Sequence, residues 1–374
     1  MWIDAERLAE ACGDRSQEAG VLITAELEPI GGPGAPVKPA VYAGGLYQQD
    51  RRWRTNGAGP EIVSVVVVDN VPSQANRLEA ALQRLRPELG LPELELDLSG
   101  GDLPPHLPGV LSGFRFPHRQ ADAYLRDAML DGTAFPKTPV GQELMAATAD
   151  NPAALLQWFP QALLYGFWQS HLGKKRSQAK LARSWVSEIA GYRPGTTGTR
   201  VLGLKGDPLN LSVDEKVTYD PEDLVGTDWQ LAEEKKAGGR RKQESLSELG
   251  HGQVPVSPND AALAGISFSE IEQRATLSLA ALRRIWVGEP GPNAAARALL
   301  ASLGIVAHVG AFGGSFSLRS GCDLRTKSSS WTWLGTGSDE PLDCAGLPSA
   351  IALFRACVAQ AEDAGPTGQR SRCS

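Results

Sequence analysis

Apolar residues recur along this chain at two spacings, and each spacing predicts a type of element. Residues 20–27 (GVLITAEL) and 61–68 (EIVSVVVV) are short runs rich in β-branched side chains, which predicts two strands. The second run is almost uninterrupted Val, as in a central strand that is buried on both faces. Between these strands, residues 28–60 carry Gly-Gly-Pro-Gly and Asn-Gly, which predicts an irregular insertion with room for a hairpin.

The helical spacing of three and four residues predicts a helix over 73–86. Ser73 is its expected N-cap, and its buried stripe consists of Leu78, Leu82 and Leu85. Further helices are predicted over 117–130, 141–149, 153–159, 177–190, 269–287, 293–303 and 347–363, and further strands over 162–168, 305–311 and 315–319. A strand followed after a short turn by a helix indicates a layered α/β or α+β fold.

The length of 374 residues allows two or three small domains or one large domain with insertions. Hydrophobic residues make up 42% of the chain and charged residues 21%, which is ordinary for a globular protein. The stretch least like packed core is 193–262, where glycines and blocks of charge predict a charged, mobile insertion. The tail at 365–374 is predicted to be disordered.

Several classes of protein are excluded by what the sequence lacks. The five Cys residues form no Cys-x-x-Cys pair, which argues against a zinc knuckle or an iron–sulfur site, and their scattered, odd number fits a reducing cytosol. Residues 1–10 do not resemble a signal peptide, and the apolar run at 62–68 is too short to span a membrane. No standard catalytic motif is present, so we expect a protein that is not an enzyme and has no cofactor. From the cysteines and the short apolar runs we expect a cytoplasmic protein with no metal and no membrane partner.

Charge is distributed unevenly, although the net charge of −6 alone speaks against a nucleic-acid partner. Between positions 171 and 205 there are eight Lys and Arg residues and one acid, which gives +7. Between positions 206 and 250 there are eleven acids and six bases, which gives −5. A basic stretch of this kind is compatible with binding to nucleic acid.

The strongest candidate motif is VDNVPSQANRLEAAL at 68–82, where a strand leads into a helix. Free N–H groups at a helix N-terminus attract phosphate. Ser73, Gln74 and Asn76 add hydrogen-bonding groups there, and Arg77 adds a charged fork that suits phosphate oxygens. An ordinary capped helix with an exposed Arg would give the same pattern.

A second motif, GKKRSQAKLARSWVSEIAG at 173–191, places Lys174, Lys175 and Arg176 before a predicted helix. Lys180 and Arg183 lie on the polar face of that helix, so the stripe would follow a nucleic-acid backbone. A solvated basic face is the alternative. The Gly-rich loop that follows ends at Arg200, and it fits either an anion-binding nest or a plain turn.

Two smaller features complete the set of candidates. FGGSFSLRSGCDL at 312–324 brings Arg319 next to two glycines, which suits close approach to a nucleic-acid backbone or a tight turn into an edge strand. His118 and Arg119 stand together at a predicted helix start, where they would touch a phosphate or lie on an exposed first turn.

These residues occur in stretches that resemble a known family, the backbone subunit of the type I-U (I-G) CRISPR surveillance complex, a protein of the Cas-seven type in Cascade. The resemblance is carried by the stretches 68–82, 116–127, 162–189, 199–200, 207–208, 275–285, 295–305 and 318–324. It implies an α+β fold with an RRM-like (ferredoxin-like) palm that is decorated by insertions, one of them a thumb-like hairpin, within a single domain over 1–374.

The resemblance also implies a function, that of a non-catalytic subunit that polymerises along CRISPR RNA and presents the guide to target DNA. Its implied partners are CRISPR RNA, target DNA, further copies of itself and other Cascade subunits. The family's Ser-Gln-x-x-basic helix start carries over to Ser73, Gln74 and Arg77, while Asn70 stands where the family has Ser. The full set of expected RNA-contacting residues is Asn70, Ser73, Gln74, Asn76, Arg77, His118, Arg119, Lys174, Lys175, Arg176, Lys180, Arg183, Arg200 and Arg319.

Two other functions remain open from the sequence. An RNA-processing endoribonuclease would use His118 or His171 as general base, with a nearby Lys to stabilise the developing charge. A scaffold protein that binds no nucleic acid would fit the acidic pI of about 5.5.

Overall fold

The computed structural model describes residues 2–57, 59–101, 103–104, 106–169, 179–195, 216–220, 222, 229–231, 242–245, 265–344 and 346–364. Helices and strands contribute almost equally to these residues, so the α+β fold class is confirmed. The predicted tail at 365–374 and most of the predicted insertion at 193–262 lie outside the described residues.

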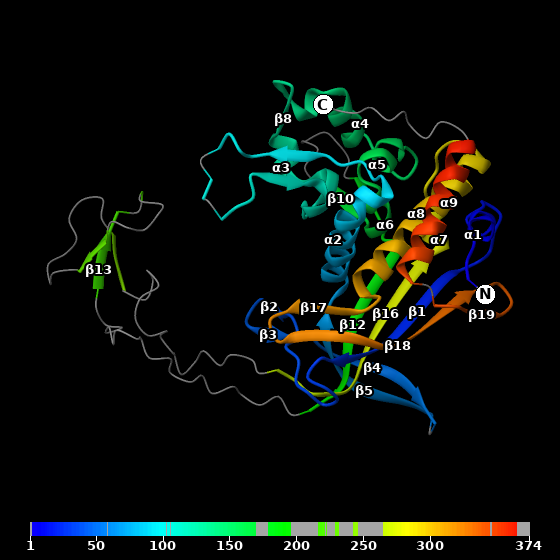
Figure 1. The fold of residues 1–374 in the computed structure, drawn as a ribbon, viewed down its shortest axis with the longest axis horizontal. Helices are drawn as coiled ribbons and strands as arrows, with labels where there is room; N and C mark the ends of the chain where they lie inside the picture. Colours follow the sequence, from blue (N-terminus) through cyan, green and yellow to red (C-terminus); the bar gives the residue numbers. More distant parts are fainter. Residues whose placement is uncertain are drawn as a thin grey trace.

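One large antiparallel sheet organises the protein (Figure 1). Its strands are β1 (Gly20–Pro29), β4 (Gln49–Asn56), β5 (Gly59–Asp69), β12 (Trp185–Pro194), β16 (Phe268–Ser278), β17 (Ser315–Arg319), β18 (Cys322–Leu334) and β19 (Asp339–Leu342). The spatial order is β17-β18-β1-β16-β12-β5-β4, and β19 pairs with β18. The Val run of β5 is buried and lies between β4 and β12, as its sequence predicts.

Helices cover one face of this sheet. Along β1, Val21 and Ile23 are buried on the helical side, while Leu22 and Thr24 between them are partly exposed on the other side. The covering helices are α1 (Ala5–Ala11), α2 (Val71–Leu89), α8 (Pro290–Phe312) and α9 (Leu347–Asp363). Their apolar faces and the buried side of the sheet form one hydrophobic core.

Helix α8 is apolar around most of its circumference because it packs against α1, α2, α6 (Pro160–Tyr165) and α9. Its length and hydropathy would also suit a membrane span, and 83% of that stretch is buried inside the protein. The same helix explains why the strand predicted at 305–311 is wrong: an all-round apolar segment has no period that separates helix from strand.

A second region of short elements lies between α2 and β12. It contains the hairpins β6–β7 (Glu95–Asp97, Val110–Ser112), β8–β9 (Met129–Leu130, Thr133–Ala134) and β10–β11 (Phe167–Gln169, Ala179–Leu181), with η1 (Gly113–Arg115), η2 (Arg119–Ala121), α3 (Ala123–Asp127), η3 (Phe135–Lys137), α4 (Pro139–Met145), α5 (Ala153–Trp158) and α6. The helix predicted over 117–130 is thus replaced by η2, α3 and β8. The strand predicted over 162–168 is mostly α6.

Two longer helix predictions are also wrong. The described part of 177–190 forms β11 and the start of β12, and residues 269–278 lie in β16, which is followed by the short helix α7 (Leu279–Leu282). In β12 the buried side chains include Trp185, Ser187 and Ile189, at the strand spacing of two. Leu181, Trp185 and Ile189 also fit the helical spacing of four, so pairing with neighbouring strands decides the outcome.

Two insertions leave the sheet in different ways. Residues 28–60 contain the small hairpin β2–β3 (Val41–Tyr42, Leu46–Tyr47) and then β4, which extends the main sheet. The other leaves between β12 and β16, which stay paired as far as Pro194 and Phe268, and the Gly195 N–H donates to the Ser267 carbonyl at 2.8 Å. Its described residues form a three-stranded sheet of β13 (Lys216–Tyr219), β14 (Trp229–Leu231) and β15 (Lys242–Ser245).

Candidate nucleic-acid interface

A buried carboxylate, Asp69, lies where β5 ends and α2 begins. The helix starts at Val71, and Asn70 is its N-cap, with the Asn70 Oδ1 atom accepting from the Ser73 backbone N–H at 3.1 Å. The prediction of Ser73 as N-cap is therefore wrong by three residues. Because the turn is so short, the Asp69 side chain lies against the first turns of α2 and is wholly buried.

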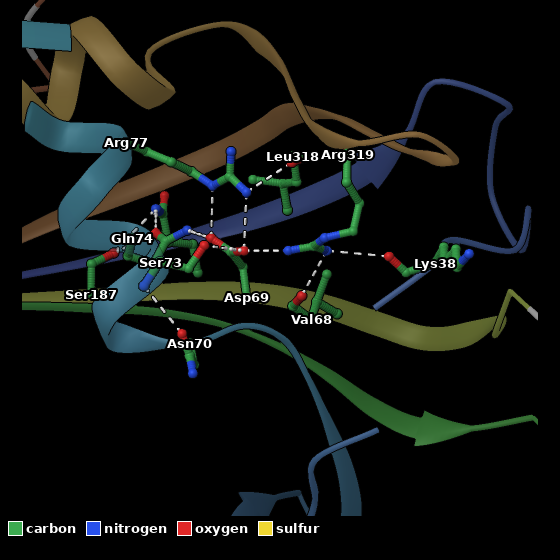
Figure 2. A network of polar contacts seen from close by, with 11 residues as sticks. Lys38, Val68, Asp69, Asn70, Ser73, Gln74, Arg77, Ser187, Leu318 and Arg319 are labelled. Carbon is green, nitrogen blue, oxygen red and sulfur yellow. Dashed lines mark hydrogen bonds and ion pairs between the residues drawn. The ribbon is translucent and has the colours of Figure 1, made fainter. Parts of the chain in front are cut away.

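Four side chains donate hydrogen bonds to Asp69 (Figure 2). Ser73 Oγ lies 2.9 Å and Gln74 Nε2 lies 2.6 Å from the carboxylate. Arg77 binds both carboxylate oxygens, through Nε at 2.9 Å and Nη2 at 3.2 Å. Arg319, which ends β17, donates to the same carboxylate. The structure thus brings together residues that are far apart in the sequence.

The same side chains tie this network to the rest of the sheet. Gln74 Oε1 accepts from Ser187 Oγ and from Gln273 Nε2, each at 2.8 Å, which links α2 to β12 and β16. Arg77 donates to the Leu318 carbonyl at 2.8 Å, and Arg319 donates to the Val68 carbonyl at 3.0 Å. The network therefore fixes the position of both guanidinium groups.

The network has an excess of one positive charge. Burial alone would raise the pKa of Asp69, but the hydrogen bonds and charge of Arg77, with the bonds from Gln74 and Ser73, lower it below the usual value. One carboxylate therefore faces two guanidinium groups, whose side chains are 25% (Arg77) and 24% (Arg319) exposed. Lys38 is exposed, and its carbonyl accepts from Arg319 at 3.2 Å. This arrangement suits an anion at the surface.

The predicted residues around this network differ in what they offer to a ligand. Gln74 is completely buried, so in this arrangement its amide organises the network. Asn76 is exposed on α2, while Asn70 and Ser73 are half-buried and bound to the helix start and to Asp69. Direct RNA contact by any of them stays a prediction.

Arg119 is held by a different carboxylate. It donates to both oxygens of Glu79, at 2.7 and 2.9 Å, and to the Gly166 carbonyl at 2.9 Å. Both side chains are largely buried, so the Arg119 guanidinium group is already bonded to Glu79 on α2 and to the turn before β10. His118, which precedes it, is exposed.

The second predicted motif is only partly described. Lys180 lies in β11, with its Nζ atom 6.0 Å from the centre of the Trp168 ring, and Arg183 is exposed in the link to β12. Lys180 thus lies on a strand and Arg183 in a loop, so the predicted stripe of basic residues along a helix is wrong. Lys174, Lys175, Arg176, Arg200 and His171 lie outside the described residues.

A groove of about 610 Å³ runs along the face of the sheet that the helices leave open. Arg52 forms an ion pair with Glu188 at 2.5 Å, and Arg54 pairs with Glu270 and stacks over the Tyr192 ring at 4.0 Å. The charges in this groove are largely balanced, unlike those at Asp69. Within the described part of the chain, no group of three or more His, Cys, Asp or Glu side chains is placed to hold a metal ion.

Sequence analysis did not single out Asp69, which lies at the centre of the network, or Lys38, whose carbonyl accepts from Arg319. Asp69 had a usable sequence signal, because it directly follows a buried Val run and precedes a helix. A carboxylate at such a place is buried and needs hydrogen-bonding or charged partners, which nearby cations can supply. Lys38 gave no local signal, since only the fold brings residues 28–60 beside β17.

Comparison with known proteins finds a family match over part of the chain. No curated protein matches the chain. Residues 21–194, from β1 to the end of β12, match the family described as CRISPR-associated protein GSU0053. This range includes Asp69 and α2 with Arg77, which lie at the centre of the site. The match supports a CRISPR-associated protein of the GSU0053 type.

Proposed function

We propose that this protein is the non-catalytic, CRISPR RNA-binding backbone subunit of a type I-U (I-G) Cascade complex in CRISPR defence. Copies would polymerise along the guide and, with other Cascade subunits, present it to target DNA. The observation that carries the proposal is the surplus positive charge at Asp69, in a protein whose family is CRISPR-associated.

The strand order supports an RRM-like, ferredoxin-like palm as the core of such a subunit. The strands β18-β1-β16-β12 are neighbours in that order, with α2 between β1 and β12 in the chain and α8 between β16 and β18. These elements form two strand–helix–strand units whose strands interleave in one sheet. On that reading, β4 and β5 extend the palm, and the segment between β12 and β16 is the candidate thumb.

The chemistry at Asp69 fits a subunit that holds any guide sequence. Guanidinium groups bind phosphate through paired hydrogen bonds, and such contacts carry no base information. Sequence reading is then left to base pairing. Because Asp69 fixes the two guanidinium groups before RNA arrives, less side-chain freedom is lost on binding.

RNA binding measured against salt concentration tests this function. We expect the protein co-expressed with CRISPR RNA to purify as a large assembly that contains RNA of regular length. Lys38→Ala, which leaves the Asp69 network intact, should weaken binding equally for all guide sequences and reduce the log–log salt slope by about 0.7 to 1.

The matched control is Arg355→Ala, an exposed arginine on α9 whose change should leave the slope unaltered. Sequence-dependent losses in Lys38→Ala, or an RNA-free monomer even with partner subunits present, would contradict the proposal. RNA incubated with the wild type and with His118→Ala should stay equally intact, and cleavage that depends on His118 would point to a nuclease instead.

A further inference from the structure

The hairpin β4–β5 carries an exposed apolar pair near its turn, at the end of β5 opposite to Asp69. Trp53 and Ile62 lie directly across from each other on the two strands, and they are 70% and 46% exposed. Side chains paired in this way share one face of a sheet and lie within contact range. Arg51, two residues before Trp53 on the same face, is also exposed and forms no ion pair among the described residues. Arg51, Trp53 and Ile62 are called the hairpin patch below.

The rest of the hairpin is attached to the sheet through charged contacts. Arg52 forms an ion pair with Glu188 on β12 at 2.5 Å, and Arg54 pairs with Glu270 on β16. These contacts hold the hairpin patch on a rigid support. Because β4 is also an edge strand, the large exposed aromatic ring of Trp53 lies at the kind of surface that proteins usually cover.

A cavity of about 490 Å³ lies among η2, α3, α4 and β10, toward the other end of the molecule (Figure 1). We call it the α3–α4 cavity. Leu125, Phe135, Leu144 and Phe167 give it apolar walls, and Trp168, which is 60% exposed, also lines it. Its volume is in the range of sites that hold small organic groups.

The charged side chains that line the α3–α4 cavity are already bound. Arg119 is neutralised by Glu79 and Arg126 by Asp127, while Asp122 accepts a backbone N–H group on either side of it, at 3.0 Å each. None of these groups is available to a charged ligand. The cavity therefore suits an apolar or aromatic side chain better than a phosphate or a metal ion.

We propose that the hairpin patch of one copy of this protein inserts into the α3–α4 cavity of a second copy. Trp53 would fill the cavity, with Ile62 against its apolar walls. The charges also match, because Glu143, next to Leu144 on α4, is exposed and forms no ion pair among the described residues, so it can receive Arg51. Trp and Arg are the side chains that most often dominate the energetics of protein interfaces.

The positions of the two surfaces select a second copy as the occupant. In Figure 1, β4 and β5 extend to the lower edge of the main sheet, whereas α3 and α4 lie at the upper edge of the molecule, so the two surfaces of one chain do not meet. Each copy carries both surfaces, so the contact is head-to-tail and leaves one patch and one cavity open for further copies. The inference rests on the proposed function only in that guide RNA would align the copies.

Photo-crosslinking identifies the occupant. Full-length protein with p-benzoylphenylalanine in place of Trp53, mixed with isotope-labelled wild type, should give a dimer in which position 53 is joined to a labelled peptide that contains Leu125, Leu144 or Trp168. The same group in place of Trp286, which is 42% exposed, is the control and should give no such product. Cross-links to any other surface, or only to a different protein when the assembly is purified from cells, would overturn the inference.

Charge reversal across the contact gives a second readout. In sedimentation velocity, with and without CRISPR RNA, Trp53→Ala should weaken self-association about tenfold, while Trp286→Ala should not. Arg51→Glu and Glu143→Arg should each weaken it, and the double variant should recover most of the loss. Because these side chains are exposed, all variants should melt with the wild type. Association that Trp53→Ala leaves unaltered, or that the double reversal leaves as weak as the single ones, would overturn the inference.

RNA length separates this inference from the proposed function. A short RNA that a single copy covers should bind Trp53→Ala as tightly as the wild type, with the same Lys38-dependent salt slope, whereas on a long guide the Trp53→Ala copies should bind without cooperativity. If Trp53→Ala assembles on a long guide as the wild type does, the contact is wrong and the backbone function stands. If the RNA-free protein associates in a Trp53-dependent way but binds no RNA, the contact stands and the backbone function is wrong.

Discussion

Removal of Arg119 should destabilise the protein without lowering the salt-dependent RNA binding that we propose for it. Arg119→Ala leaves Glu79 buried on α2 with none of its two Arg119 hydrogen bonds. The exposed fractions of the two side chains are 12% and 4%, so solvent screens the pair little. Loss of one partner of a buried ion pair costs about 3–5 kcal/mol. For 374 residues unfolding together, that corresponds to a fall in Tm of about 4–6 °C.

The double variant Glu79→Met/Arg119→Met isolates the cause. With both charges replaced by apolar side chains, no unpaired carboxylate remains, and stability should return to within about 1–2 kcal/mol of the wild type. Urea unfolding of Glu79→Met, Arg119→Met and the double variant closes the thermodynamic cycle. An Arg119→Ala variant of wild-type stability that loses RNA affinity with a reduced salt slope would refute this reasoning and restore Arg119 as an RNA contact.

The pH dependence of stability should also report the burial of Glu79 beside Arg119. Burial raises the pKa of Glu79, and Arg119 only partly opposes that effect. The native state therefore holds more protons than the unfolded chain between the ordinary and the raised pKa, so stability falls as pH rises through this window. Without Arg119 the raised pKa should move higher, so Arg119→Ala should be least destabilising at acidic pH.

Three further outcomes follow from buried groups elsewhere. Asp69→Asn should lower stability by about 2–3 kcal/mol at pH 7. The lowered pKa of Asp69 contributes stability that is lost as pH falls through the folded-state pKa. The free energy of unfolding of the variant, measured in urea, should therefore vary less with pH on the acid side. Gly304→Ala should cost about 1–3 kcal/mol, since its Cβ would lie 2.7 Å from Trp185, whereas Gly291→Ala on the same helix meets open space and should show wild-type melting. Burial lowers the pKa of His308 to about 3, so between pH 6.5 and 3 only the unfolded chain takes up a proton at this residue, and stability falls as pH falls. His308→Leu should remove this contribution. An unchanged pH dependence of the unfolding free energy in urea would contradict the assignment.

The sequence predicted the elements whose patterns are unambiguous. The strands at 20–27, 61–68 and 315–319 and the helices at 73–86 and 347–363 are all present. Each combines one clear spacing with recognisable turn or cap residues. Leu78 and Leu82 are buried as expected, and Leu85 is partly buried.

The errors have physical reasons. Residues 273–278 alternate in burial as a strand, but Ile271, Ala275 and Leu279 also satisfy a helical spacing, and only pairing with β1 and β12 resolves the ambiguity. The candidate site was predicted better at its α2 end than elsewhere, because helix starts have local sequence signals. The convergence of Arg77 and Arg319 on Asp69 depends on contacts between residues 250 positions apart, and spacing within a motif carries no information about them.

The closure between β12 and β16 has a consequence for the modularity of the chain. Both ends of the segment between Gly195 and Ser267 are joined by a hydrogen bond at the end of one continuous ladder. Each doubling of a loop's length changes its closure free energy by only about 0.6 kcal/mol. The segment can therefore be lengthened, shortened or exchanged while the main sheet keeps its strand pairing, so this part of the chain can diversify independently of the residues that hold Asp69.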